Sequence, residues 1–322
     1  MRKRYLKLSP EEWQAKIKAA QDLAHPCCLC PRQCQAQRPQ QRGFCQQGPM
    51  ALAHMQDHFG EEPFLVGQHG SAAFFFMGCN LRCVYCQNWE ISRGKFAAAQ
   101  IISPSKLAQH FLRAQEREVA NLNLVTPTVF LPEILAAIYE AAQQGLKLPI
   151  VYNTSSYESP RALAILENVV DIYLADLKYD DAVIAQRYSA AANYPQVAQH
   201  ALQIMQQQVG GLIWQGGQLR RGLVIRHLVL PGQVAAAQRI GRWVAKHFAQ
   251  AYFSLLAQYN PPRDLPETNA WPELKRGLTP AEYALAWAAA PPKHCLGQEL
   301  SAASTWVPCF NTQGSDKFKH DN

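Results

Sequence analysis

The sequence predicts an α/β fold built on a parallel sheet. Short apolar runs of strand length recur from about residue 72, and helical patterns separate them. Six runs rich in β-branched or aromatic residues are expected as strands: 73–77, 121–125, 149–153, 170–177, 223–230 and 251–257. Strands that alternate with helices run parallel and are joined by right-handed crossovers. A barrel-like sheet and a doubly wound open sheet both satisfy this pattern.

The segments between the expected strands carry helix signals. Ser103 precedes Pro104 as a helix N-cap, and Gly145 stands where a C-cap glycine is expected. Helices are expected within 103–118, 131–145, 159–168, 181–209 and 235–248.

Composition divides the chain into three parts. Residues 1–68 form a leading segment, with a helix over 9–24 that begins with a capping box of Ser9 and Glu12 and is followed by a cysteine-rich loop. Residues 69–260 form the core with the strand–helix rhythm. Residues 261–322 lose that rhythm, contain one expected helix at 279–290, and end in a polar stretch, 312–322, that is expected to be disordered.

Charge and hydropathy limit the function classes. The 322-residue chain is 48% hydrophobic, which supports a sizeable core, and its formal charge of +7 suits an anionic partner or an ordinary basic enzyme. The start has no apolar stretch of the kind in a signal peptide, and no run of about 18 apolar residues predicts a membrane span. A cytoplasmic protein is therefore expected. In that reducing compartment, clustered cysteines favour metal binding or catalysis over disulfides.

Cys79, Cys83 and Cys86 are spaced by four and three residues and directly follow the strand expected at 73–77. Three thiolates on a [4Fe–4S] cluster leave one iron open for a substrate or cofactor, whereas four would saturate it. Gly78 allows a tight turn that places the loop at the C-terminal face of the sheet, where α/β barrels keep their chemistry. A zinc ion is the alternative to the cluster at these cysteines, but zinc usually requires a fourth Cys or His nearby. His69, the nearest histidine upstream, lies across the strand.

The stretch C-N-L-R-C-V-Y-C-Q-N, residues 79–88, resembles the Cys-x3-Cys-x2-Cys signature of the radical S-adenosylmethionine enzymes. It is most similar to the branch of the pyruvate formate-lyase-activating enzymes and their uncharacterised relatives, and the resemblance covers roughly residues 70–260. It implies a partial (β/α)6 barrel. It also implies an oxidoreductase in which S-adenosylmethionine binds the open iron and is cleaved to a 5′-deoxyadenosyl radical for hydrogen abstraction.

The same resemblance assigns expected roles to polar residues at the ends of the later strands. Asp176 and Lys178 resemble an Asp-x-Lys pair that contacts the cofactor's ribose and carboxylate. Arg226, before HLVLPG, resembles a family Arg shifted by one position. His227 alternates with Arg226, so only one of them can face the barrel.

The remaining expected cofactor contacts lie near strand ends or in the cysteine loop. Tyr85 is expected near the adenine, and Asn88 matches an Asn common after the third Cys. Asn153 and Ser155 are expected to hydrogen-bond the cofactor or to cap the next helix. Thr126, together with Thr128, stands where the activating enzymes carry Gly-Gly-Glu, so this sequence departs from them there.

A second group of cysteines lies in the leading segment. Cys27, Cys30, Cys34 and Cys45 form C-x2-C-x3-C-x10-C, with Cys28 as an extra thiol. The pattern resembles the leader found in relatives of this branch. Four thiolates would close a structural zinc site or bind a second iron–sulfur cluster, and free or redox thiols are the third interpretation.

The leading hypothesis is a radical enzyme that is reduced by a flavodoxin or ferredoxin. It would act on a glycine of a glycyl radical protein, as an activase, or on a small molecule or RNA. The hypothesis of another class is a zinc protein that binds nucleic acid. Scattered Lys and Arg residues, without a basic stripe, argue against nucleic acid as a partner.

Overall fold

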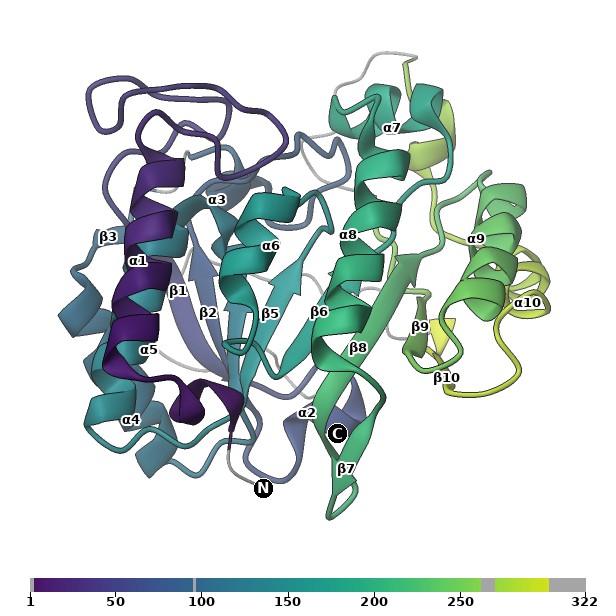
Figure 1. The fold of residues 1–322 in the computed structure, drawn as a ribbon. Helices are drawn as coiled ribbons and strands as arrows, with labels where there is room; N and C mark the ends of the chain where they lie inside the picture. The colour runs from purple at the N-terminus through teal and green to yellow at the C-terminus, as the bar shows by residue number, and fades with distance from the viewer. Residues whose placement is uncertain (1–2, 95–96, 262–269, 301–322) are drawn as a thin grey trace.

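The computed structural model describes residues 3–94, 97–261 and 270–300, and its centre is one mostly parallel sheet (Figure 1). The strand order is β10-β9-β8-β6-β5-β4-β2-β1-β3, and β7 pairs with β8. The strands are β1 Ala51–His58, β2 Ser71–Phe76, β3 Gln100–Ile101, β4 Leu122–Val125, β5 Ile150–Thr154, β6 Ile172–Asp176, β7 Ile213–Gln215, β8 Gln218–Leu228, β9 Tyr252–Leu256 and β10 Cys295–Gly297.

Helices connect the parallel strands. The α-helices are α1 Pro10–Ala24, α2 Pro63–Val66, α3 Trp89–Ser92, α4 Pro104–Glu116, α5 Leu131–Gln143, α6 Pro160–Leu166, α7 Ala182–Ser189, α8 Tyr194–Val209, α9 Val234–His247 and α10 Pro280–Trp287. Short 3-10 helices lie at Arg4–Lys7, Pro127–Phe130 and Pro272–Lys275. Helices α1, α6 and α8 lie on the near side of the sheet in Figure 1.

The sheet has the topology of a partial barrel. Strands β2, β4, β5, β6, β8 and β9 are neighbours in chain order and pair in parallel, and they correspond to the six strands that the sequence predicts. A doubly wound sheet would reverse its order at one point, and this one does not. The sheet is not closed, because antiparallel β1 borders β2 and short β10 borders β9. The predicted α/β class and partial barrel are confirmed.

Several elements differ from the prediction. Strand β1 was not predicted because ALAHMQDH carries few large apolar side chains, and it lies toward one edge of the sheet with most of its residues partly exposed. The predicted helix over 181–209 is two helices, since Ala190 adopts a left-handed conformation at φ 53° and Pro195 lies in the first turn of the next helix.

The leading segment packs on the core. Helix α1 starts at the expected capping box of Ser9 and Glu12. The ring of Trp13 is buried and stacks on Tyr139 of α5 at 5.5 Å between centroids. The domain boundary at residue 68 stays a prediction, although β1, which precedes it, pairs with the core sheet.

Toward the other end of the chain, α10 has Thr279 as its N-cap in a second capping box, and it lies within the helix expected at 279–290. The stretch predicted to be disordered, 312–322, lies outside the described residues. Among the helices of the described residues, none combines the length and apolarity that crossing a bilayer requires.

Candidate functional site

A cavity of about 260 Å³ opens at the C-terminal ends of the parallel strands. The loop after β2 supplies one wall with Cys79, Cys83 and Cys86, and the ends of β5, β6 and β8 supply another. Every cofactor-binding residue that the sequence predicts lines this cavity: Tyr85, Asn88, Thr126, Asn153, Ser155, Asp176, Lys178 and Arg226. The fold therefore gathers residues from across about 150 positions of sequence around the three cysteines.

The cysteine loop turns out of β2 at Gly78, whose φ is 81°. A Cβ there would lie 2.4 Å from Gln47 Cγ and 2.8 Å from the Cys45 carbonyl, so both conformation and space require glycine. Donors then point at the sulfurs: the Leu81 amide at Cys79 Sγ (3.4 Å) and Ser189 Oγ at Cys83 Sγ (2.9 Å). Such donors stabilise the thiolate form that binds a metal.

Burial raises the pKa of the Cys79 thiol to about 12, and the neighbouring Cys83 adds to the shift. Burial also raises the pKa of Cys86. Thiols in this state release their protons to solvent readily only when a cation binds, because the cation stabilises the thiolate in place of the solvation that burial removes. The loop is thus better suited to hold a metal cluster than to present free nucleophiles.

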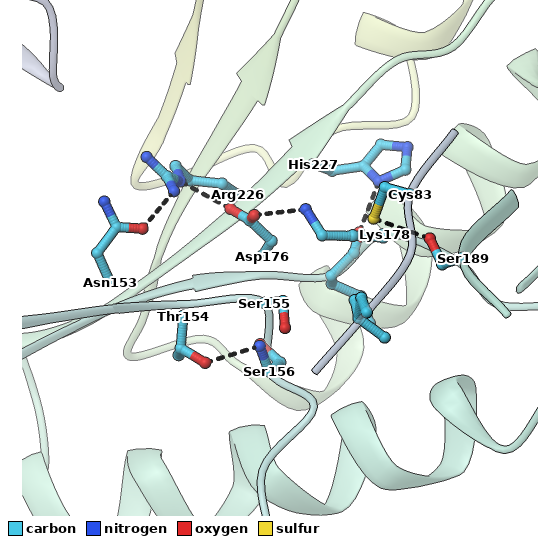
Figure 2. A network of polar contacts seen from close by, with 12 residues as sticks. Cys83, Asn153, Thr154, Ser155, Ser156, Asp176, Lys178, Ser189, Arg226 and His227 are labelled. Atoms are coloured by element: carbon cyan, nitrogen blue, oxygen red, sulfur yellow. Dashed lines mark hydrogen bonds and ion pairs between the residues drawn. The ribbon is translucent and has the colours of Figure 1, made fainter. Parts of the chain in front are cut away.

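A compensated charge network lies beside the cysteines (Figure 2). Asp176, at the end of β6, accepts from Lys178 Nζ at 2.6 Å and from Arg226 Nε at 2.8 Å. Arg226 Nη2 also donates to Asn153 Oδ1 at 2.7 Å, and its Nη1 donates to Glu61 at 3.0 Å. These partners fix the orientation of each group before any ligand arrives.

The network also fixes the protonation states. Burial would raise the pKa of Asp176, but Arg226 and Lys178 outweigh it and hold the pKa below the usual range. Burial would lower the pKa of Lys178, but Asp176 and Cys83 raise it instead. At neutral pH the cavity therefore presents an ionised carboxylate and a charged ammonium.

A chain of hydroxyls connects Tyr85 to the cysteines. Tyr85 is buried, its hydroxyl contacts that of Tyr179 at 2.7 Å, and Tyr179 contacts Ser189 Oγ at 2.6 Å. Ser189 in turn donates to Cys83. The Tyr85 ring lines the cavity, while its hydroxyl belongs to this chain.

Two residues that the sequence analysis considered for the site lie away from the cavity. The Thr128 hydroxyl donates to the buried Glu158 at 2.6 Å, so of the two threonines only Thr126 lines the cavity. His227 points away from the network, contacts the Leu177 carbonyl at 2.7 Å, and has its pKa lowered to about 4 by burial (Figure 2). His227 is a satisfied core histidine, and Arg226 is the residue that faces the cavity.

Sequence reasoning missed Glu61 and Ser189. Glu61 follows β1, a strand that was not predicted, and it enters the cavity from a segment 165 positions away from its partner Arg226. Ser189 ends α7, whose C-terminus was hidden within the single predicted helix. The break before Tyr194-Pro195 is the one sequence signal for that helix end.

The cysteines of the leading segment lie elsewhere. Cys27, Cys30, Cys34 and Cys45 line a second, smaller cavity. In the part of the chain that the structure describes, no three His, Cys, Asp or Glu side chains lie close enough to hold a single metal ion.

Comparison with known proteins agrees with the site. Residues 74–207 match the family model of the Radical SAM superfamily, a range that contains the three cysteines, Asp176 and Lys178. The chain is also 27% identical over 287 residues to Uncharacterized protein MJ0674 of Methanocaldococcus jannaschii, which covers 84% of this chain and 76% of the relative. The superfamily is one of enzymes that use a [4Fe–4S] cluster and S-adenosylmethionine. We conclude that the chain contains a radical SAM superfamily domain.

Proposed function

We propose that this protein binds a [4Fe–4S] cluster through Cys79, Cys83 and Cys86 and uses S-adenosylmethionine for hydrogen abstraction. The observation that carries the proposal is the shared cavity: the three thiols face the same space as the Asp176–Lys178 pair. When bound, the cluster and S-adenosylmethionine supply reductive cleavage of a carbon–sulfur bond and a 5′-deoxyadenosyl radical.

The described residues fit both groups. The cavity of about 260 Å³ is at the lower end of the range of small-molecule sites, and part of its wall is polar. Asn88 Oδ1 is buried without a hydrogen-bond partner in the structure, as expected of an acceptor that awaits a ligand donor. Lys178 is suited to a carboxylate and Asp176 to ribose hydroxyls, because each is fully charged there.

The protein's own contribution is orientation and shielding. Arg226 holds Asp176 from one side, which leaves Lys178 on the side nearer Cys83 (Figure 2). Tyr85 is 7% exposed, and its ring covers the cavity together with the apolar end of β2. Exclusion of water protects a reactive radical from side reactions.

The departure at residues 124–128 bears on the choice between an activase and a stand-alone enzyme. Where the activating enzymes carry Gly-Gly-Glu, this chain presents the Thr126 hydroxyl in a left-handed backbone conformation with φ 58°. On this ground we place a stand-alone oxidoreductase, acting on a small molecule or an RNA, ahead of a glycyl-radical activase. Its electron donor would be of the flavodoxin or ferredoxin class.

The test is anaerobic turnover. Protein reconstituted with iron and sulfide, reduced with dithionite and mixed with S-adenosylmethionine should release 5′-deoxyadenosine. Cys83→Ala should abolish this product, and Cys295→Ala, which changes a cysteine in β10, should retain it. A reconstituted wild-type protein that binds iron and sulfide yet forms no product would overturn the proposal. Protein that takes up no iron on reconstitution, holds only zinc and forms no product would favour the nucleic-acid-binding alternative.

A further inference from the structure

The structure brings four cysteines of the leading segment to one place. Cys27, Cys30, Cys34 and Cys45 span 19 positions and line a single cavity of about 20 Å³. Cys28, next to the first of them, does not line it. The four lining cysteines are the ones that share the C-x2-C-x3-C-x10-C spacing, so the fold separates them from the extra thiol.

Backbone amides point at these sulfurs. The Phe44 amide donates to Cys34 Sγ at 3.3 Å, the Arg32 amide donates to Cys30, and the Gln47 amide donates to Cys45. Amide donors of this kind neutralise part of the charge of a ligating thiolate and fix its direction. Three of the four thiols thus have the supporting hydrogen bond of a metal ligand.

The chain also leaves room for these sulfurs. A Cβ at Gly43 would lie 3.0 Å from Cys34 Cβ and 3.1 Å from its Sγ. A side chain at this position would force the Cys34 side chain to shift by a few tenths of an ångström.

Two guanidinium groups line the same cavity, those of the buried Arg38 and the half-buried Arg32, and each has one buried nitrogen without a hydrogen-bond partner. Arg38 Nη1 donates to the Val129 carbonyl at 2.9 Å, and Arg32 Nε donates to the Asn80 carbonyl at 3.0 Å. Arg38 Nε and Arg32 Nη2 are buried without a hydrogen-bond partner in the structure. A buried cationic donor without a partner costs free energy, so the cavity favours a negatively charged group beside these nitrogens.

From the shared lining and the two guanidinium groups, we infer that Cys27, Cys30, Cys34 and Cys45 bind a zinc ion as a tetrathiolate site. Among the described residues the thiols are too far apart to hold one ion as they stand, so binding requires their side chains to rotate toward it. Four thiolates around a divalent cation carry a net charge of about −2, which two guanidinium groups balance. A cavity of about 20 Å³ accommodates roughly one water-sized particle. A cluster of four irons and four sulfides is several-fold larger, so a single ion is favoured over a second [4Fe–4S] cluster. Each thiol gives its proton to solvent on binding, and the four side chains turn inward to reach the ion.

This zinc site would position the other cysteine loop. The Phe44 ring lies between the guanidinium groups of Arg32, at 3.8 Å, and Arg82, at 4.4 Å. Arg82 also donates to the Phe44 carbonyl, and Arg32 to the carbonyl of Asn80, the neighbour of Cys79. The segment around Cys45 thus packs on the loop that presents Cys79, and losing the zinc would loosen that loop.

Metal analysis of the full chain tests the inference without any turnover. Protein purified anaerobically, before reconstitution, should contain about one zinc per chain. Cys30→Ser and Cys45→Ser should lose most of it, whereas the matched control Cys28→Ser should keep it. The result is independent of the proposed radical chemistry, because Cys83→Ala should also keep its zinc.

A wild-type measurement guards against variants that fail to fold. Cobalt(II) substituted into the wild-type protein should give the thiolate-to-cobalt charge-transfer and ligand-field bands of a tetrahedral tetrathiolate site. Four outcomes would overturn the inference: no zinc, zinc retained in Cys45→Ser, cobalt spectra without thiolate bands, or about eight irons per chain after reconstitution, which would indicate a second cluster.

Discussion

An aspartate lies at each end of strand β6, and the pKa values of the two carboxyl groups are shifted in opposite directions. Asp176, at the C-terminal end, is paired with Arg226 and Lys178, and its pKa is lowered. Asp171, just before the strand, is fully buried, and burial raises its pKa to about 6 although Lys3 opposes the shift.

The opposite pKa shifts distinguish a carboxylate of the proposed ligand site, Asp176, from one that only supports the fold, Asp171. At the cavity end, charges are kept ionised by partners that leave space between them for a ligand. At the other end, Asp171 Oδ2 accepts the Ile150 amide at 3.0 Å and thereby joins the starts of β5 and β6. A carboxylate that serves only as a hydrogen-bond acceptor does not need its charge, whereas one that positions Lys178 does.

Removing Arg226 should give the largest effect. Arg226→Ala removes the cation of the partly buried Glu61 and one of the two cations that contact Asp176, and we expect a loss of about 3–5 kcal/mol in the free energy of unfolding, as for other broken buried pairs. Urea denaturation measures it. The matched control is Arg239→Ala, which breaks an exposed pair with Asp180 and should cost less than about 1 kcal/mol. Equal losses in the two variants would refute the idea of a compensated cavity.

Asp171, the aspartate at the other end of β6, should make the free energy of unfolding depend on pH. Because the folded pKa of Asp171 lies above its ordinary value of 3.8, the folded state holds its proton longer, and stability falls as pH rises from about 4 to about 6. The shift of roughly two units corresponds to about 3 kcal/mol. Asp171→Asn should remove this dependence and be the more stable protein at pH 7.

The measurement for Asp171 is a series of urea titrations of both proteins between pH 4 and pH 8. The difference between the two proteins isolates this one group from all others that titrate in the range. Parallel stability curves would mean that Asp171 ionises normally and that the contrast between the two ends of β6 is smaller than proposed.

Lys178 should matter for ligand affinity more than for folding. Lys178→Met keeps most of the unbranched side chain and removes its charge, so the Kd of S-adenosylmethionine for reconstituted enzyme should rise about 10–100-fold, the range of one charged hydrogen bond. Equilibrium binding measures it. The control is Lys147→Met, which changes an exposed lysine just before β5, at the opposite edge of the sheet. It should leave the Kd unchanged. An unchanged Kd in Lys178→Met would remove this residue from the proposed cofactor site.

Much of the fold could be predicted because the core strands have strong local signals. Strands β5 and β6 are runs of buried, mostly apolar residues, and α1 begins at an unmistakable capping box. Strand β1 lacked such a signal, since its place in the sheet depends on pairing with β2, twenty residues further along. Edge elements of this kind are determined by tertiary contacts and not by local propensity.

The candidate site shows the same division. The cysteine spacing and Asp176-x-Lys178 are local patterns, and both could be found in the sequence. Glu61 could not, because nothing in the local sequence indicates that a residue after β1 meets Arg226 on β8. Thr126 and Thr128 are two positions apart and would share a face in a strand, but the left-handed turn at Thr126 sends them to different cavities.

The smallest predicted effect concerns the tuning of the proposed cluster. Ser189 is fully buried and donates to Cys83 Sγ at 2.9 Å. Hydrogen bonds to cluster sulfurs raise the reduction potential, so Ser189→Ala should shift it to more negative values, on the order of tens of millivolts for one neutral hydrogen bond. A redox titration followed by electron paramagnetic resonance measures the shift. Ser71→Ala deletes an equally buried serine hydroxyl, bonded to Asn121 at the opposite end of the sheet, and should leave the potential unchanged. A shift of equal size in both variants would mean that general loosening of the fold, and not the bond to Cys83, sets the potential.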